Sequence, residues 1–256
     1  MKDIQSLPDY RRINIKKVGV KNISYPITVL DKQKTLQHTV ATVNMYVNLP
    51  HQFKGTHMSR FVEILNRFHG RIDLKSFHII LEEMKDKLKA EEAHMEIEFP
   101  YFLKKKDLKS PNTVGISEYK CKMHGALDNR DELSLLVQVP IYPPVVSQVG
   151  DRLPRSLGHW GIAEICLQFK HFIWIEDIIT MVEEVTSHNL KWPPAAGDSD
   201  NLLSVEKITK KLGEKLRSHE DIKWFVVTVK NLSQGLNTFA SIQWPEEADT
   251  RPTVIC

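Results

Sequence analysis

Apolar and polar residues alternate along most of the segment Thr39–Leu49. This period of two is typical of a strand that buries one face and turns the other toward solvent. The buried face is predicted to contain Ala41, Val43, Met45, Val47 and Leu49. The preceding segment, Lys17–Asp31, is predicted to be the hairpin partner of this strand, and its Pro26 favours a sheet edge or a bend.

The spacing of apolar residues changes to three and four after this strand, which predicts two amphipathic helices. The first would begin near Thr56, a good N-cap residue, and the second follows Gly70. Their apolar stripes are Met58, Phe61, Val62, Leu65 and Phe68, and then Leu74, Phe77, Leu81, Met84 and Leu88.

Alternation returns at Ala93–Phe99, with Ala93, Met95, Ile97 and Phe99 predicted to point inward. The segment Ser117–Gly125 is predicted to pair with this strand.

The second half of the chain repeats the order strand, strand, helix, helix, strand, strand, at an offset of about 120 residues. The predicted strands cover 132–139, 162–169, 223–231 and 237–244, and the predicted helices cover 175–185 and 205–216, the latter with Ser204 as N-cap. Strands grouped around paired helices indicate an α+β fold with antiparallel sheets, in two modules at 1–128 and 129–256. Strands of the second half carry apolar residues on both faces, which favours burial against another subunit: Leu136, Phe225 and Val227.

Composition narrows the class of protein without identifying it. The 256 residues are 41% hydrophobic and 26% charged with a net charge of +3, so no nucleic-acid partner is expected. The chain starts without a signal-peptide pattern and has no apolar run long enough for a membrane span. Its three cysteines, Cys121, Cys166 and Cys256, form no CxxC pair and predict no disulfide framework. A cytoplasmic protein without a membrane partner is expected, with Cys121 and Cys166 as buried apolar residues.

Three groups of residues are candidates for chemistry. His57, Ser59 and Arg60 lie where the first helix begins, and backbone amides, the helix dipole and a guanidinium together suit a phosphate group. The alternative is that Arg60 pairs with a carboxylate while the other two cap the helix. The row His94, Glu96 and Glu98 suits acid–base or metal chemistry, but a solvent-facing strand explains it more simply. His38 precedes the clearest strand and has a structural hydrogen-bonding role as its alternative.

The line Leu36–Phe68, with "QHTVA" and "GTHMSRFVE", closely resembles the type IB GTP cyclohydrolases. The resemblance is strong over residues 7–104 and continues as an order of elements to about residue 245. It implies two tunnelling-fold modules per chain that join across subunits into a homo-oligomeric barrel, a homotetramer. It also implies that GTP is hydrolysed to 7,8-dihydroneopterin triphosphate and formate, toward folate and other pterins. By this resemblance His57, Ser59, Arg60 and His38 bind substrate.

The resemblance further implies a divalent metal, zinc or manganese, held by a cysteine in a Cys-Pro-Cys-Ser stretch, a histidine and a glutamate. This chain departs from that pattern. The segment Ile141–Gly150 contains no cysteine, His159 lies near the place of the metal-binding histidine, and Gln234 takes the place of a catalytic histidine.

Three accounts of this departure stay open. In the first account the chain is a catalytically impaired paralogue that binds purines or pterins or assists assembly. In the second it holds its metal with other ligands, such as His159 with Asp151 or a residue of a neighbouring subunit. The third account is a segment around 141–160 mistranslated relative to the ancestral gene.

Overall fold

The computed structural model describes residues 15–49, 57–68, 70, 72–106, 114–141, 161–188, 204–233 and 236–246. Within these ranges the chain forms eight strands and four helices. It divides into two compact units after Ser134, inside the fifth strand.

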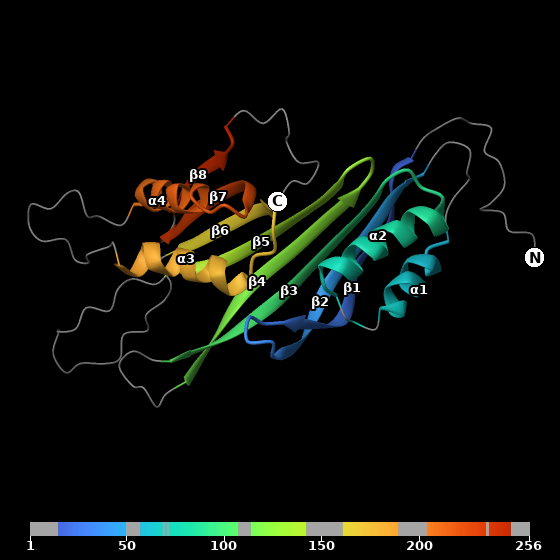
Figure 1. The fold of residues 1–256 in the computed structure, drawn as a ribbon, viewed down its shortest axis with the longest axis horizontal. Helices are drawn as coiled ribbons and strands as arrows, with labels where there is room; N and C mark the ends of the chain where they lie inside the picture. The colour runs from blue at the N-terminus through green and yellow to red at the C-terminus, as the bar shows by residue number, and fades with distance from the viewer. Residues whose placement is uncertain are drawn as a thin grey trace, which may run out of the picture. The chain divides into compact units, whose positions relative to one another are not determined.

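In the first unit four antiparallel strands follow one another in sequence order, and two helices connect the second to the third (Figure 1). The elements are β1 (Ile15–Leu30), β2 (Leu36–Leu49), α1 (Ser59–Arg67), α2 (Leu74–Leu88), β3 (Ala93–Lys106) and β4 (Val114–Leu127). Both helices lie on one face of the sheet, and α2 contacts β2, β3 and β4. We call the opposite side of β1–β4 the helix-free face.

The predicted alternation decides which side chains meet the helices. Residues at odd positions of β2 and β3 pair across the strands, such as Val43 with Ile97 and Met45 with Met95, and all four are fully buried. The even positions lie on the helix-free face. The predicted hairpin is confirmed, with β1 antiparallel to β2 and Pro26 opposite Val40 on the outermost strand of this unit.

The first helix differs in detail from its prediction. It begins at Ser59 with Met58 as the N-cap residue, and the predicted N-cap Thr56 lies outside the described residues. Its buried residues are Phe61, Ile64 and Leu65, whereas Met58 and Val62 of the predicted stripe are exposed. The buried face of the helix is therefore rotated about the helix axis relative to the prediction. Ile64 and Leu65, three and four residues after Phe61, share its face, whereas Val62 does not.

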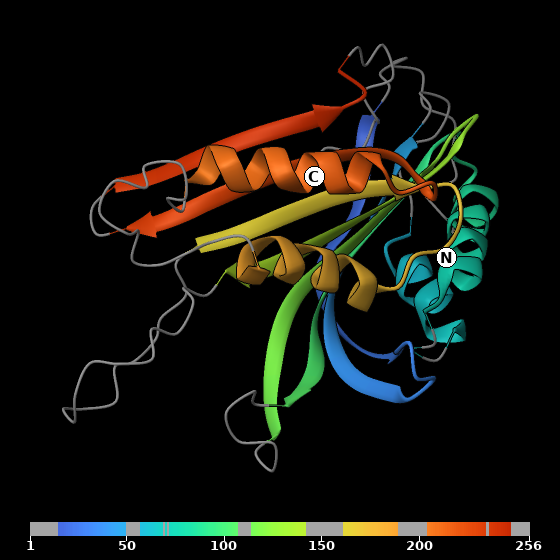
Figure 2. The same ribbon diagram turned by 60° about the vertical axis from the view of Figure 1, so that its left-hand side comes forward.

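The second unit has the same plan, with two helices on one face of four antiparallel strands (Figures 1 and 2). Its elements are β5 (Asp131–Ile141), β6 (Gly161–Phe169), α3 (Ile175–His188), α4 (Val205–Arg217), β7 (Ile222–Ser233) and β8 (Leu236–Trp244). Ser204 caps α4 as predicted, since its Oγ accepts from the Lys207 amide at 3.2 Å.

The predicted α+β fold with antiparallel strands and paired helices is therefore confirmed. Cys121 and Cys166 are both buried within strands. Cys166 is disulfide-bonded, so the prediction that it serves only as a small apolar residue is wrong. None of the helices in the described ranges is long and apolar enough to span a bilayer.

Candidate functional site

The start of α1 brings together three of the predicted site residues, His57, Ser59 and Arg60. Two of the amides expected to be open to an anion are occupied by turn hydrogen bonds. The Arg60 amide donates to the His57 carbonyl at 3.1 Å, and the Phe61 amide donates to the Met58 carbonyl at 3.2 Å. The remaining anion-binding capacity at this helix end therefore rests on Ser59 and on the Arg60 side chain.

The Arg60 guanidinium reaches across to the neighbouring helix. Its Nη1 donates to the carbonyl of Lys87, in the last turn of α2, at 3.3 Å. A cation at this position is favoured by the negative end of the α2 dipole. Among the described residues the Arg60 guanidinium contacts this backbone carbonyl and no carboxylate, which does not support the alternative of a carboxylate pair.

The other predicted site residues lie elsewhere. His38 is on the helix-free face near the start of β2, where its Nδ1 is 3.2 Å from the Thr28 hydroxyl of β1. Gln234 and His159 lie outside the described residues.

A polar cluster occupies the helix-free face of the first unit. The sheet register places Asn44, Glu96 and His124 in one row across β2, β3 and β4, and it places Tyr46 opposite His94 in the next row. The sequence-based expectation of a solvent-facing row is only partly correct. Glu98 is exposed, but His94 has 12% of its side chain exposed and His124 is 6% exposed.

Glu96 is held as a carboxylate at the centre of this cluster. It accepts from Asn44 Nδ2 at 3.0 Å and lies 3.4 Å from the Lys122 ammonium. Burial raises the pKa of Glu96, but the Asn44 hydrogen bond and the charge of Lys122 outweigh burial and hold that pKa below its usual value. Asn44 is itself fixed, because its Oδ1 accepts from the backbone amide of Asn22 at 2.8 Å.

The two histidines of the cluster are neutral at pH 7. Burial lowers the pKa of His124 to about 4, against a weaker opposing effect of Glu96. Burial also lowers the pKa of His94, although Glu92 opposes this. The His94 ring stacks on Tyr46 at a centroid distance of 4.8 Å and lies 6.1 Å from the His124 ring.

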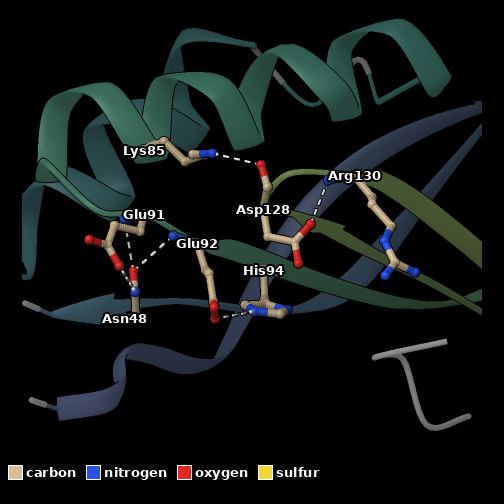
Figure 3. A network of polar contacts seen from close by, with 7 residues as sticks. All are labelled: Asn48, Lys85, Glu91, Glu92, His94, Asp128 and Arg130. Atoms are coloured by element: carbon tan, nitrogen blue, oxygen red, sulfur yellow. Dashed lines mark hydrogen bonds and ion pairs between the residues drawn. The ribbon is translucent and has the colours of Figure 1, made fainter. Parts of the chain in front are cut away.

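A second polar network lies beside His94, where β3 begins and β4 ends (Figure 3). Asn48 Oδ1 accepts from the backbone amides of Glu91 and Glu92 at 2.9 and 2.8 Å. The Glu92 carboxylate lies 3.8 Å from His94 Nε2, and Lys85 Nζ donates to the Asp128 carbonyl at 2.9 Å. These contacts tie the loop before β3 and the turn after β4 to the rest of the unit.

The sequence did not reveal that Tyr46 and His124 belong to the polar cluster on the helix-free face. Alternation along "YKCKMHG" assigns His124 to the polar side of its strand, but only the cross-strand register brings it beside Glu96 and His94.

The family resemblance implies a metal with cysteine, histidine and glutamate ligands. No group of three or more His, Cys, Asp or Glu side chains within the described ranges is arranged to hold a metal ion. The described residues therefore do not by themselves make the expected metal centre, and His159 is outside them.

Comparison with known proteins identifies relatives of this chain. Residues 1–193 match the family model of type I GTP cyclohydrolase folE2. A GTP cyclohydrolase FolE2 of Syntrophobacter fumaroxidans is 42% identical over 243 residues, which cover 90% of this chain and 93% of that protein. A GTP cyclohydrolase FolE2 of Syntrophus aciditrophicus is 42% identical over 260 residues, which cover 95% and 99% of the two chains.

Solved structures show the same fold at much lower sequence identity. The uricase from Arthrobacter globiformis matches with a TM-score of 0.56 at 5% identity, covering 93% of this chain and 96% of the uricase. A uricase from Bacillus fastidious matches with a TM-score of 0.56 at 8% identity, covering 94% and 99%. These likenesses support the tunnelling fold alone, whereas the sequence matches extend over most of the chain and show that it belongs to the GTP cyclohydrolase FolE2 family.

Proposed function

We propose that this protein hydrolyses GTP to 7,8-dihydroneopterin triphosphate and formate, at the entry to tetrahydrofolate and pterin biosynthesis. The observation that carries the proposal is 42% identity over 90% or more of the chain to proteins named GTP cyclohydrolase. Identity of this extent favours an active enzyme over a catalytically impaired paralogue.

The start of α1 is the proposed site for the phosphates of GTP. His57, Ser59 and Arg60 lie within one turn there, at the positive end of the helix dipole. The Arg60 guanidinium donates to the Lys87 carbonyl at 3.3 Å, and a phosphate is a stronger, charge-assisted acceptor. His38 is also proposed to contact the substrate. It lies near the start of β2, whereas α1 follows the end of that strand.

The divalent metal, zinc or manganese, remains part of the proposal with His159 as one ligand. The described residues lack a ready set of three ligands, so we assign no catalytic step to the metal. Gln234, at the place of the family's catalytic histidine, is proposed to contact the reacting substrate. A cytoplasmic homo-oligomer, a tetramer of two-module chains with modules 1–128 and 129–256, completes the proposal.

The test is turnover of GTP by the pure protein loaded separately with zinc and with manganese. Formate and the fluorescent oxidised pterin product are measured together, and metal content is determined in the same samples. We expect stoichiometric metal and equal amounts of both products. Native mass spectrometry of the same samples is expected to show the tetramer.

Two histidine variants separate a specific effect from general damage. His159→Ala is expected to abolish turnover and to lower the bound metal. His171→Ala is the matched control, because His171 is 80% exposed and its ring contacts the Asp221 carboxylate at the surface. Absence of formate with either metal, in an assembled protein that still binds GTP, would overturn the proposed reaction.

A further inference from the structure

Two imidazoles on the helix-free face have ring nitrogens that are buried but lack a hydrogen bond to any described residue. Within the described residues, neither ring nitrogen of His124 has a hydrogen-bond partner, and neither does Nδ1 of His94. All three atoms are shielded from solvent. A buried polar atom without a partner is rare in a native structure and usually marks strain or a functional role.

Charged groups from β1, β3, β4 and the adjoining loops surround this pair. Lys17 of β1 lies 4.6 Å from the centre of the Tyr46 ring, on which His94 stacks, and Lys122 of β4 lies beside Glu96. Both ammonium groups oppose a further positive charge on His124, and Lys17 also opposes one on His94. The carboxylates that favour protonation are Glu96 for His124, and Glu92 and Asp128 for His94.

We propose that His94 and His124 form an acid-operated switch, which opens the helix-free face of the first unit when both imidazoles take up a proton. In the closed form the two rings are 6.1 Å apart and neutral, His124 is buried, and 12% of the His94 side chain is exposed. Each proton comes from solvent and adds to the lone pair of a ring nitrogen. Two imidazolium ions at this separation, beside two ammonium groups and away from water, repel one another, so the doubly protonated pair is stable only when solvated.

The contacts also set the order of the two steps. His94 takes the first proton because Glu92 and Asp128 face it, and its Nε2 is 3.8 Å from the Glu92 carboxylate. The resulting charge on His94 then disfavours protonation of His124 in the closed form. The second proton therefore requires opening, which breaks the stack of His94 on Tyr46.

The direction of the pH effect follows from the depressed pKa of each closed-state imidazole. An exposed histidine has a pKa of about 6.5, so the open form binds protons that the closed form rejects as pH falls below that value. The closed form is fully favoured above pH 6.5, and this advantage is lost as the pH falls toward about 4, the pKa of enclosed His124.

Hydrogen exchange at the amides of β3 and β4 measures the opening equilibrium. After correction for intrinsic exchange, the logarithm of the opening constant is plotted against pH between about 5 and 6.5, above the range in which ordinary carboxylates titrate. The slope counts the protons taken up on opening. An exposed histidine is half protonated at pH 6.5 and almost fully protonated at pH 5, so for the native protein we expect the slope to steepen from about −1 to about −2 over this range. His124→Asn and His94→Asn are each expected to steepen from about −0.5 to about −1, and the double variant to stay near 0.

Controls keep the result interpretable. His78→Asn removes a half-exposed histidine of α2 that contacts the Glu82 and Asp131 carboxylates and lies outside the cluster, and it is expected to keep the native slope. His94→Phe retains an aromatic ring against Tyr46. If His94→Asn fails to fold, this variant replaces it as the protein in which only His124 can take up a proton. A native slope of about −1 or shallower near pH 5, or a double variant that keeps the native slope, would overturn the switch. Imidazole proton resonances provide a second readout, in which His94 must titrate before His124.

Discussion

Gly125 of β4 permits the closest approach between the sheet and α2. A Cβ at this position would lie 2.3 Å from Cε1 of Phe77 and 3.0 Å from Cδ1 of Leu81. Both side chains are fully buried, so neither can move aside without disturbing the core. Gly125→Ala is therefore expected to lower the free energy of unfolding by about 1–3 kcal/mol, measured by urea denaturation.

Gly213 of α4 offers a matched comparison for this prediction. A Cβ there would lie 3.1 Å from Cδ1 of Ile242, the end of a flexible and only partly buried side chain. Alanine also favours a helix over glycine by up to about 1 kcal/mol. Gly213→Ala should therefore be neutral or stabilising. Equal losses from both variants would show that the tight contact at Gly125 is not the cause.

The beginning of α2 is stabilised by a reciprocal pair of hydrogen bonds. Asp73 Oδ1 accepts from the Ser76 amide at 2.7 Å, and Ser76 Oγ accepts from the Asp73 amide at 2.8 Å. Asp73→Ala removes the acceptor and leaves the Ser76 amide without this partner, which is expected to cost about 1 kcal/mol. Thermal unfolding of the variant against the native protein measures this loss.

Asp73→Asn distinguishes the hydrogen bond from the charge. Asparagine caps helices about as well as aspartate but lacks the negative charge that favours a helix N-terminus. We expect Asp73→Asn to retain most of the native stability. If Asp73→Asn loses as much stability as Asp73→Ala, the interaction of the Asp73 charge with the helix dipole, and not the capping hydrogen bond, is the main stabilising effect.

Secondary structure followed from the sequence because each element has one buried face. The stripe Phe77, Leu81, Met84 and Leu88 of α2 is buried as predicted, and so are the inward residues of β3. Ser204 was predicted as a cap, whereas Asp73 was not, because the capping box at α2 uses Asp and Ser in place of the common Ser or Thr with Glu.

The polar cluster could be predicted only in part, for a physical reason. Alternation assigns a residue to a face of its strand, but the register between strands depends on the turns and helices that connect them. His124 meets His94 and Glu96 only because Glu96 lies opposite His124 across β3 and β4. The sequence likewise gives no sign that these rings are enclosed, since burial depends on the surrounding chain.

Binding of GTP should appear as stability of the protein as a whole. A ligand that binds only the folded state, at 100 times its dissociation constant, raises the free energy of unfolding by about 2.7 kcal/mol. We expect an increase of this size with GTP in EDTA, where the absence of free metal prevents turnover. Arg60→Ala removes the guanidinium at the start of α1 and should weaken binding tenfold or more, lowering the stabilisation by about 1.4 kcal/mol.

Arg67 on the same helix supplies the control. Its Nη1 lies 2.8 Å from the Glu83 carboxylate of α2, so Arg67→Ala removes an equal charge and a surface ion pair away from the proposed phosphate site. The variant is expected to be slightly less stable by itself, yet to keep the full increase with GTP, because a surface ion pair contributes at most about 1 kcal/mol. Equal losses of GTP stabilisation in the two variants would mean that Arg60 acts only through the general positive charge of α1. The phosphate site would then have to lie at another element.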